Sequence, residues 1–146
     1  MNKQLEDVLR ERFKKLLIID DINSMSDFNL FGFQIGDGWF DIIYRAFSRM
    51  QGRVDEHDIL VGVTSVKEKY GTLRLYLATD DTVLDDIAEE AERESETACE
   101  VCGMKGSKVR RMGWYNTLCE KHASGDARPL SDLEVKQLVS QILNMN

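Results

Sequence analysis

The chain has 146 residues and a mass of 16.8 kDa, which fits a single domain, and its 42% hydrophobic content suffices for a core. Nineteen Lys and Arg against 26 Asp and Glu give a net charge of -7, so any contact with nucleic acid must be local. No apolar run reaches the roughly 18 to 20 residues of a membrane span, and residues 1–12 lack a signal-peptide hydrophobic region. These features predict a cytoplasmic protein without membrane contact.

The N-terminal third of the chain is predicted to begin with a helix. Apolar residues at helical spacing indicate an amphipathic helix over residues 3–17 whose apolar face meets the core. Residues 20–36 are mixed in polarity and predict a loop anchored by Leu30, Phe31 and Phe33.

A second helix is predicted to begin at the sequence GDGW, residues 36–39. Asp37 is a natural N-cap there, Trp39 is expected in the core, and the apolar stripe extends to about Met50. The following residues 53–58, with His57, are expected to form a polar loop.

Two β-rich segments, residues 60–68 and 72–77, flank Tyr70-Gly71 and predict an antiparallel hairpin. Residues 80–98 predict a third helix with an apolar face: Val83, Leu84, Ile87, Ala88 and Ala91. This helix carries nine acidic residues and one arginine. A last helix is predicted from Ser131, where Ser131 and Glu134 form a capping box, with an apolar stripe of Val135, Leu138, Val139 and Ile142.

The three cysteines and one of the two histidines lie close together in the sequence. They form the pattern CxxC, sixteen residues, CxxH, through Cys99, Cys102, Cys119 and His122. Thiolates and imidazole at this spacing are typical of tetrahedral zinc, and four protein ligands leave no position for a catalytic water. We therefore predict one structural Zn²⁺; free core thiols or a redox CxxC are the alternatives.

The predicted zinc segment also has a recognisable architecture. A knuckle at Gly103, a hairpin over residues 108–118 that turns near Met112-Gly113, and a short helix bearing the second ligand pair describe a treble-clef-like finger. A zinc ribbon is the alternative. The overall prediction is an α+β fold: a core over residues 1–98, a finger over 99–124 and a C-terminal helix within 125–146 that packs back on the core.

Basic and aromatic residues follow the first ligand pair. Residues 99–128 carry six basic and three acidic groups, a local charge of +3 against -10 for the remainder. Such a cluster binds nucleic acid or a partner, or its charges are used internally. From the sequence we favour internal use, in which the cluster pairs with the acidic third helix or offsets the anionic zinc site. The candidate residues are Lys105, Lys108, Arg110, Arg111, Trp114 and Tyr115, although Trp114 fits a buried plug of the finger better.

Several sequence blocks resemble a family of small, uncharacterised proteins found in bacteriophages and bacterial mobile regions. The blocks are GDGWFD at 36–41, VKEKYGTLR at 66–74, CEVCG at 99–103 and GWYNTLCEKH at 113–122. The resemblance covers roughly residues 31 to 123. It implies a phage or prophage accessory protein and transfers only the zinc-ligand role to the three cysteines and His122.

Three functions follow from these features. The first is a non-enzymatic binding module or inhibitor that docks on a host or phage protein, such as a host-defence or nucleic-acid-handling enzyme. The second is a nucleic-acid-binding zinc finger. The third, an HNH-like nuclease, is disfavoured because only His57 is free, and because Asp37, Asp41 and Glu68 have simpler explanations as cap, helix charge and surface.

Overall fold

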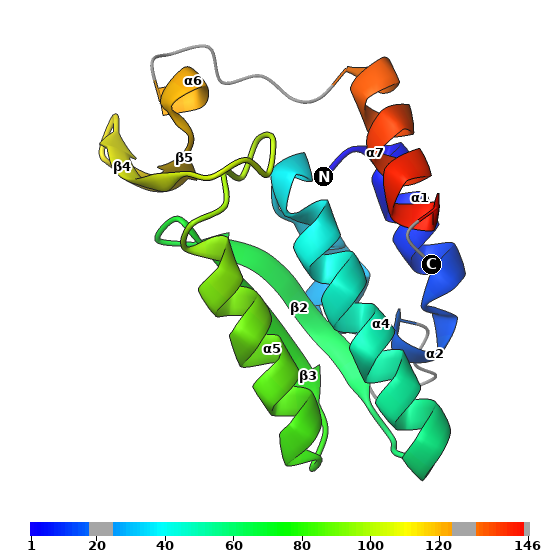
Figure 1. Cartoon of the computed structure of the whole chain (residues 1–146). Helices are drawn as coiled ribbons and strands as arrows, with labels where there is room; N and C mark the ends of the chain where they lie inside the picture. Colours follow the sequence, from blue (N-terminus) through cyan, green and yellow to red (C-terminus); the bar gives the residue numbers. More distant parts are fainter. Residues whose placement is uncertain (18–24, 124–130, 145–146) are drawn as a thin grey trace.

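The computed structural model describes residues 1–17, 25–123 and 131–144 (Figure 1). Its centre is a three-stranded sheet in the order β1-β2-β3. The predicted hairpin forms β2 (Gly62–Lys69) and β3 (Thr72–Ala78), which pair antiparallel, and the two-residue β1 (Phe33–Gln34) pairs parallel with β2. The predicted α+β class is confirmed.

Two long helices cover the sheet. α4 (Phe40–His57) packs against α5 (Thr82–Ser95), and α5 packs against β3. α5 also covers the free edge of β3, because Ser95 Oγ and Glu92 Oε1 accept the strand N–H groups of Leu73 and Leu75 at 2.9 and 3.0 Å. These contacts satisfy backbone donors that an edge strand leaves open. The sheet is therefore closed on the β3 side.

The third helix is capped at Asp81, whose side chain accepts the N–H of Leu84 at 3.0 Å. Four of the five residues predicted on its apolar face are buried, but Val83 is 40% exposed. That part of the prediction is wrong because Val83 lies in the first turn, one residue before the buried Leu84, and so faces away from the core.

The N-terminal region differs from the prediction in two places. The expected helix is split at Phe13 into α1 (Lys3–Arg12) and α2 (Lys14–Leu17). The expected loop contains α3 (Asp27–Phe31), capped by Ser26, together with β1, while its residues 20–24 lie outside the described part. Leu30 and Phe31 are exposed, so they are not anchors; Phe28 and Phe33 are buried and pack edge to face at 5.0 Å.

The start of the second helix also differs from the prediction. Residues Asp37–Trp39 form a 3₁₀ turn, η1, and the α-helix begins only at Phe40. Asp37 is not an N-cap: its carboxylate is buried, and Oδ1 accepts the backbone N–H of Asn2 at 2.6 Å. The N–H that Asp37 accepts comes from a residue distant in sequence and not from the first turn of its own helix. The local sequence does not reveal such a donor.

The second helix is longer than predicted. α4 runs to His57 and ends at Asp58, which adopts a left-handed conformation. The segment expected to be a polar loop is helical because Val54 packs on the core and Arg53 pairs with Asp81 at 2.9 Å. Tertiary contacts thus extend the helix beyond the end of its apolar stripe.

The last helix, α7 (Asp132–Asn144), begins just after Ser131 and lies beside α1 (Figure 1). Val135 is buried and Val139 is partly buried against the core. The side chains of Glu134, Leu138 and Ile142 lie outside the described part, so the predicted capping box and the rest of the stripe are not described.

The interior is one cluster of apolar side chains from α1, α2, α4, the sheet and α5. Trp39 is fully buried in it, as predicted, and its indole N–H donates to the carbonyl of Ala98 at 2.8 Å. Ala98 directly precedes the first cysteine. The core is therefore joined to the cysteine segment through one of its largest side chains.

Candidate metal centre

The residues after α5 form a small unit of their own. β4 (Ser107–Arg111) and β5 (Trp114–Leu118) pair as the predicted hairpin, followed by the short helix α6 (Glu120–Ala123). The turn residues Met112 and Gly113 both have positive φ, 49° and 85°, which is the geometry of a tight type I′ hairpin turn. We call residues 99–123 the finger.

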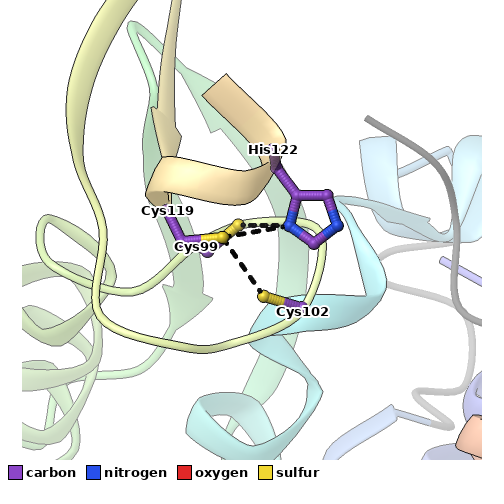
Figure 2. Close-up of side chains that lie close together, drawn as sticks. All are labelled: Cys99, Cys102, Cys119 and His122. Atoms are coloured by element: carbon purple, nitrogen blue, oxygen red, sulfur yellow. Dashed lines mark hydrogen bonds between the residues drawn. The ribbon is translucent and has the colours of Figure 1, made fainter. Parts of the chain in front are cut away.

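The four predicted ligands converge at one point of the finger (Figure 2). Their ligand atoms all lie within 4.8 Å of one another. His122 Nδ1 is 3.1 Å from Cys119 Sγ and 3.4 Å from Cys99 Sγ, and Cys102 Sγ is 3.7 Å from Cys119 Sγ. Zinc bonds of about 2.0 to 2.3 Å put tetrahedral ligands about 3.5 to 3.8 Å apart. The four side chains form a group able to bind one metal ion.

Local backbone structure produces this convergence. The N–H of Cys99 donates to Met104 O, and the N–H of Gly103 donates back to Cys99 O, both at 2.7 Å. Gly103 has φ of 78°, so the first ligand pair lies on the predicted knuckle. The second pair lies at the start of α6, where Ala123 N–H donates to Cys119 O at 2.8 Å. A knuckle, a hairpin and a helix thus supply the ligands.

The electrostatics of the two half-buried thiols differ. Burial raises the pKa of Cys102 to about 12, with neighbouring thiols adding to the effect. At Cys119 burial opposes ionisation, but N–H groups of His122 and Lys121 and the other thiols outweigh it and lower the pKa. A half-buried thiol with a raised pKa, such as Cys102, ionises readily only beside a cation, because the cation replaces the lost hydration. The donor set therefore fits a positively charged metal.

The GDGW segment packs directly against the knuckle. Gly38 N–H donates to Glu100 O at 2.9 Å. A Cβ atom on Gly38 would lie 2.1 Å from Cys99 O, and one on Gly36 would lie 2.1 Å from Glu100 O. Only glycine fits at either position, since the obstructing atoms are backbone. The absence of side chains at Gly36 and Gly38 therefore allows the backbone of the first ligand pair to pack closely against the core.

The turn of the β2–β3 hairpin meets the other side of the finger. Thr117 Oγ1 donates to Gly71 O at 2.6 Å, and Asn116 Nδ2 donates to Glu100 Oε1 at 2.6 Å. Burial raises the pKa of Glu100. GDGW, the YG turn and the two cysteine blocks thus meet at one junction between core and finger. This convergence was not predicted from the sequence, where the glycines at 36, 38 and 71 are the signal that indicates it.

The predicted pairing of the basic cluster with the acidic helix is wrong. The α5 carboxylates Glu94 and Glu90, and the cap Asp81, instead pair with arginines spaced four residues apart on α4: Arg45, Arg49 and Arg53. The arginines of α4 face α5 directly and therefore pair with its carboxylates in place of the basic residues of the finger. Among the described residues, no ion pair engages Lys105, Lys108 or Arg110, and all three are exposed.

Of the remaining candidate residues in the finger, one makes structural hydrogen bonds and two are exposed aromatic residues. Arg111 donates to the carbonyls of His122 and Ala123, both at 2.8 Å, so it stabilises the end of α6 next to the ligand. Trp114 is 76% exposed, which contradicts a buried plug, because it lies beside the projecting hairpin turn. Tyr115 is 44% exposed, with the Arg110 guanidinium 5.8 Å from its ring centre.

The carboxylates considered for catalysis are not brought together. Asp41 pairs with Arg45, Glu68 accepts the N–H of Gly71, and Asp37 is held by Asn2. His57 ends α4 beside Glu56. In the part of the chain that the structure describes, the Cys99 group is the one set of three or more such side chains arranged to hold a metal.

No protein-family model, curated protein or solved structure matches this chain. Within residues 1–17, 25–123 and 131–144, no helix combines the length and the apolar character that a membrane crossing requires. The conclusions about function therefore come from the site itself.

Proposed function

We propose that the protein is a non-enzymatic, zinc-stabilised module that binds nucleic acid through its finger. The observation that carries the proposal is the exposed hairpin, where Lys108 and Arg110 have no ion pair among the described residues and the Arg110 guanidinium lies 5.8 Å from the ring centre of the exposed Tyr115. Basic side chains hold phosphates, and aromatic faces stack on bases. Pairing of the finger's basic residues with α5 would have argued against this function. Among the described residues the α5 carboxylates Glu90 and Glu94, and the cap Asp81, pair instead with arginines of α4.

Zinc is the metal that best suits the proposal. Three thiolates and one imidazole are soft and borderline ligands, and four protein ligands close a tetrahedral site. In this role the ion joins the knuckle to α6 and thereby holds the hairpin in place. Arg111 supports the same structure, so it belongs to the scaffold and not to the proposed binding face.

Docking on a host or phage protein, as in the inhibitor hypothesis, is the competing function. It would use the acidic helix α5 as a phosphate-like surface. The pairing of Asp81, Glu90 and Glu94 with arginines leaves that helix less charge to offer than its sequence indicates. The basic hairpin therefore supports nucleic acid better.

The test is titration of labelled single- and double-stranded DNA and RNA at low and moderate salt. We expect salt-dependent binding that Lys108→Ala/Arg110→Ala weakens for every sequence. Two lost phosphate contacts should lower the salt slope by about 1.4 on a single strand. Lys3→Ala/Lys14→Ala is the matched control, since it removes the same charge from exposed positions on α1 and α2. Absence of salt-dependent binding at micromolar protein would overturn the proposal.

A further inference from the structure

The outer face of the β2–β3 hairpin carries basic and aromatic residues beside two buried polar residues, Ser65 and Thr72. Val66, Leu73 and Leu75 are buried on the inner face, so the alternating Lys67, Arg74 and Tyr76 lie on the outer face. Tyr76 is 44% exposed, and Tyr70, at the turn, is 64% exposed. Both tyrosine rings are therefore accessible from solvent.

Three of the chain's four tyrosines share one arrangement. Lys67 Nζ lies 5.7 Å from the ring centre of Tyr76, Lys69 Nζ lies 5.7 Å from that of Tyr70, and Arg110 lies 5.8 Å from that of Tyr115. Each exposed ring is thus paired with one cation. Proteins that bind single-stranded nucleic acid combine such aromatic rings, on which bases stack, with basic side chains along the path of the bound strand.

Two of the tyrosine–cation pairs, those of Tyr70 and Tyr115, flank the contact between the β2–β3 turn and the finger. Thr117 contacts Gly71, next to Tyr70, through its 2.6 Å hydrogen bond. Tyr115 is two residues from Thr117 on β5, so both side chains lie on the same face of the finger hairpin, about 7 Å apart along the strand. Figure 1 shows the β2–β3 turn beside β5. Tyr76 lies about 16 Å along the hairpin from that turn.

Charge alone does not account for this surface. Lys67 Nζ is 3.9 Å from Asp27, and Arg74 Nη1 is 3.7 Å from Glu92, so both cations are partly neutralised. Stacking must therefore supply more of the affinity on the sheet than on the finger. Stacking needs unpaired bases, because a duplex buries their faces in its own stack.

We propose that single-stranded nucleic acid crosses the outer face of β2–β3 and continues onto the finger, with bases stacked on Tyr76, Tyr70 and Tyr115. The proposal rests on the proposed function of the finger and extends it to a surface that the zinc site does not include. The finger supplies the salt-sensitive phosphate contacts through Lys108 and Arg110. The sheet supplies base stacking and makes the protein prefer single strands.

The test compares Tyr70→Asn/Tyr76→Thr with the wild type, using a fluorescein-labelled oligothymidine of about 12 nucleotides, which spans a site of this kind. Asn tolerates the positive φ of 54° at position 70, and Thr suits a strand. We expect affinity to fall about 10-fold or more with an unchanged salt slope, whereas Lys108→Ala/Arg110→Ala flattens the slope. Tyr76→Trp should retain binding, and thermal melting should confirm that each variant is folded.

Each other outcome separates the two proposals. If the tyrosine variant binds like the wild type while the finger variant loses binding, the sheet surface is overturned and the finger proposal stands. If polyglutamate or a duplex competes as well as the single strand, the surface does not select unpaired bases and the inference fails. If the wild type binds no nucleic acid, both proposals fail together.

Discussion

The core and the finger of this protein are stabilised by different means. The core buries a continuous cluster of apolar side chains, including Phe13 packed edge to face on Tyr44 and Phe47. Of the finger's side chains, only Cys99, Thr117, Leu118 and His122 are buried, and two of these are metal ligands. A unit with so little apolar burial cannot offset its chain entropy by packing alone. We therefore expect the finger to depend on a bound metal ion and on its contacts with the core.

The sharpest test of this difference is removal of the metal. Structural zinc contributes about 10 to 16 kcal/mol to isolated fingers at neutral pH. Chelation, or Cys102→Ser, should unfold the finger while the helices of the core remain. Native mass spectrometry should report one Zn²⁺ per chain, and circular dichroism should show that most of the helical signal survives.

Met104→Ser is the matched control, because Met104 is 67% exposed and only two residues from Cys102. It should keep both metal and melting temperature. A metal-free protein that melts like the wild type would mean that packing alone holds the finger together.

The next largest effect should come from the junction between the two regions. Gly38→Ala places a methyl group 2.1 Å from Cys99 O and 2.7 Å from Cys102 N, and backbone cannot move aside as a side chain does. We expect a loss of about 3 kcal/mol in unfolding free energy, the upper end for overpacking, together with weaker zinc retention. Denaturant unfolding and zinc competition measure the two effects.

Gly52→Ala is the opposite case, at a glycine inside α4 and away from the junction. Gly52 lies inside α4 with open space around its Cβ position, so alanine should stabilise the protein by about 0.5 to 1 kcal/mol. If Gly38→Ala proved as harmless as Gly52→Ala, the close approach of GDGW to the knuckle would not exist in solution.

The two regions also differ in what their sequence predicted. Period-two alternation identified the β2–β3 hairpin, and ligand spacing identified all four residues of the metal centre, because both signals are local. The exposure of Trp114 was not predictable in this way. A small finger has no interior for an indole, and the ring's position depends on how far the hairpin projects.

Long-range pairing was the main source of error. Arg45, Arg49 and Arg53 recur every four residues and thus share one face of α4, which is the signal that the carboxylates of α5 already have partners. Asp37 illustrates the same point, since cap propensity is local but its actual donor, Asn2, is 35 residues away. Where a charged residue has several suitable partners in the sequence, the tertiary fold determines which of them it contacts.

The smallest expected loss of stability concerns Asp37, which ties the N-terminal segment to the 3₁₀ turn at the junction. Asp37→Ala leaves the Asn2 N–H without its acceptor, and we expect a loss of about 1 to 2 kcal/mol. Asp37→Asn should cost less, because the amide oxygen still accepts that N–H, and the group it replaces, Oδ2, has no partner among the described residues. Denaturant unfolding of both variants measures the difference. Nucleic-acid binding should be unchanged in each, since Asp37 is buried and its side chain is not accessible to a ligand. Equal losses of stability in the two variants would show that the charge of Asp37, and not the hydrogen bond to Asn2, stabilises the junction.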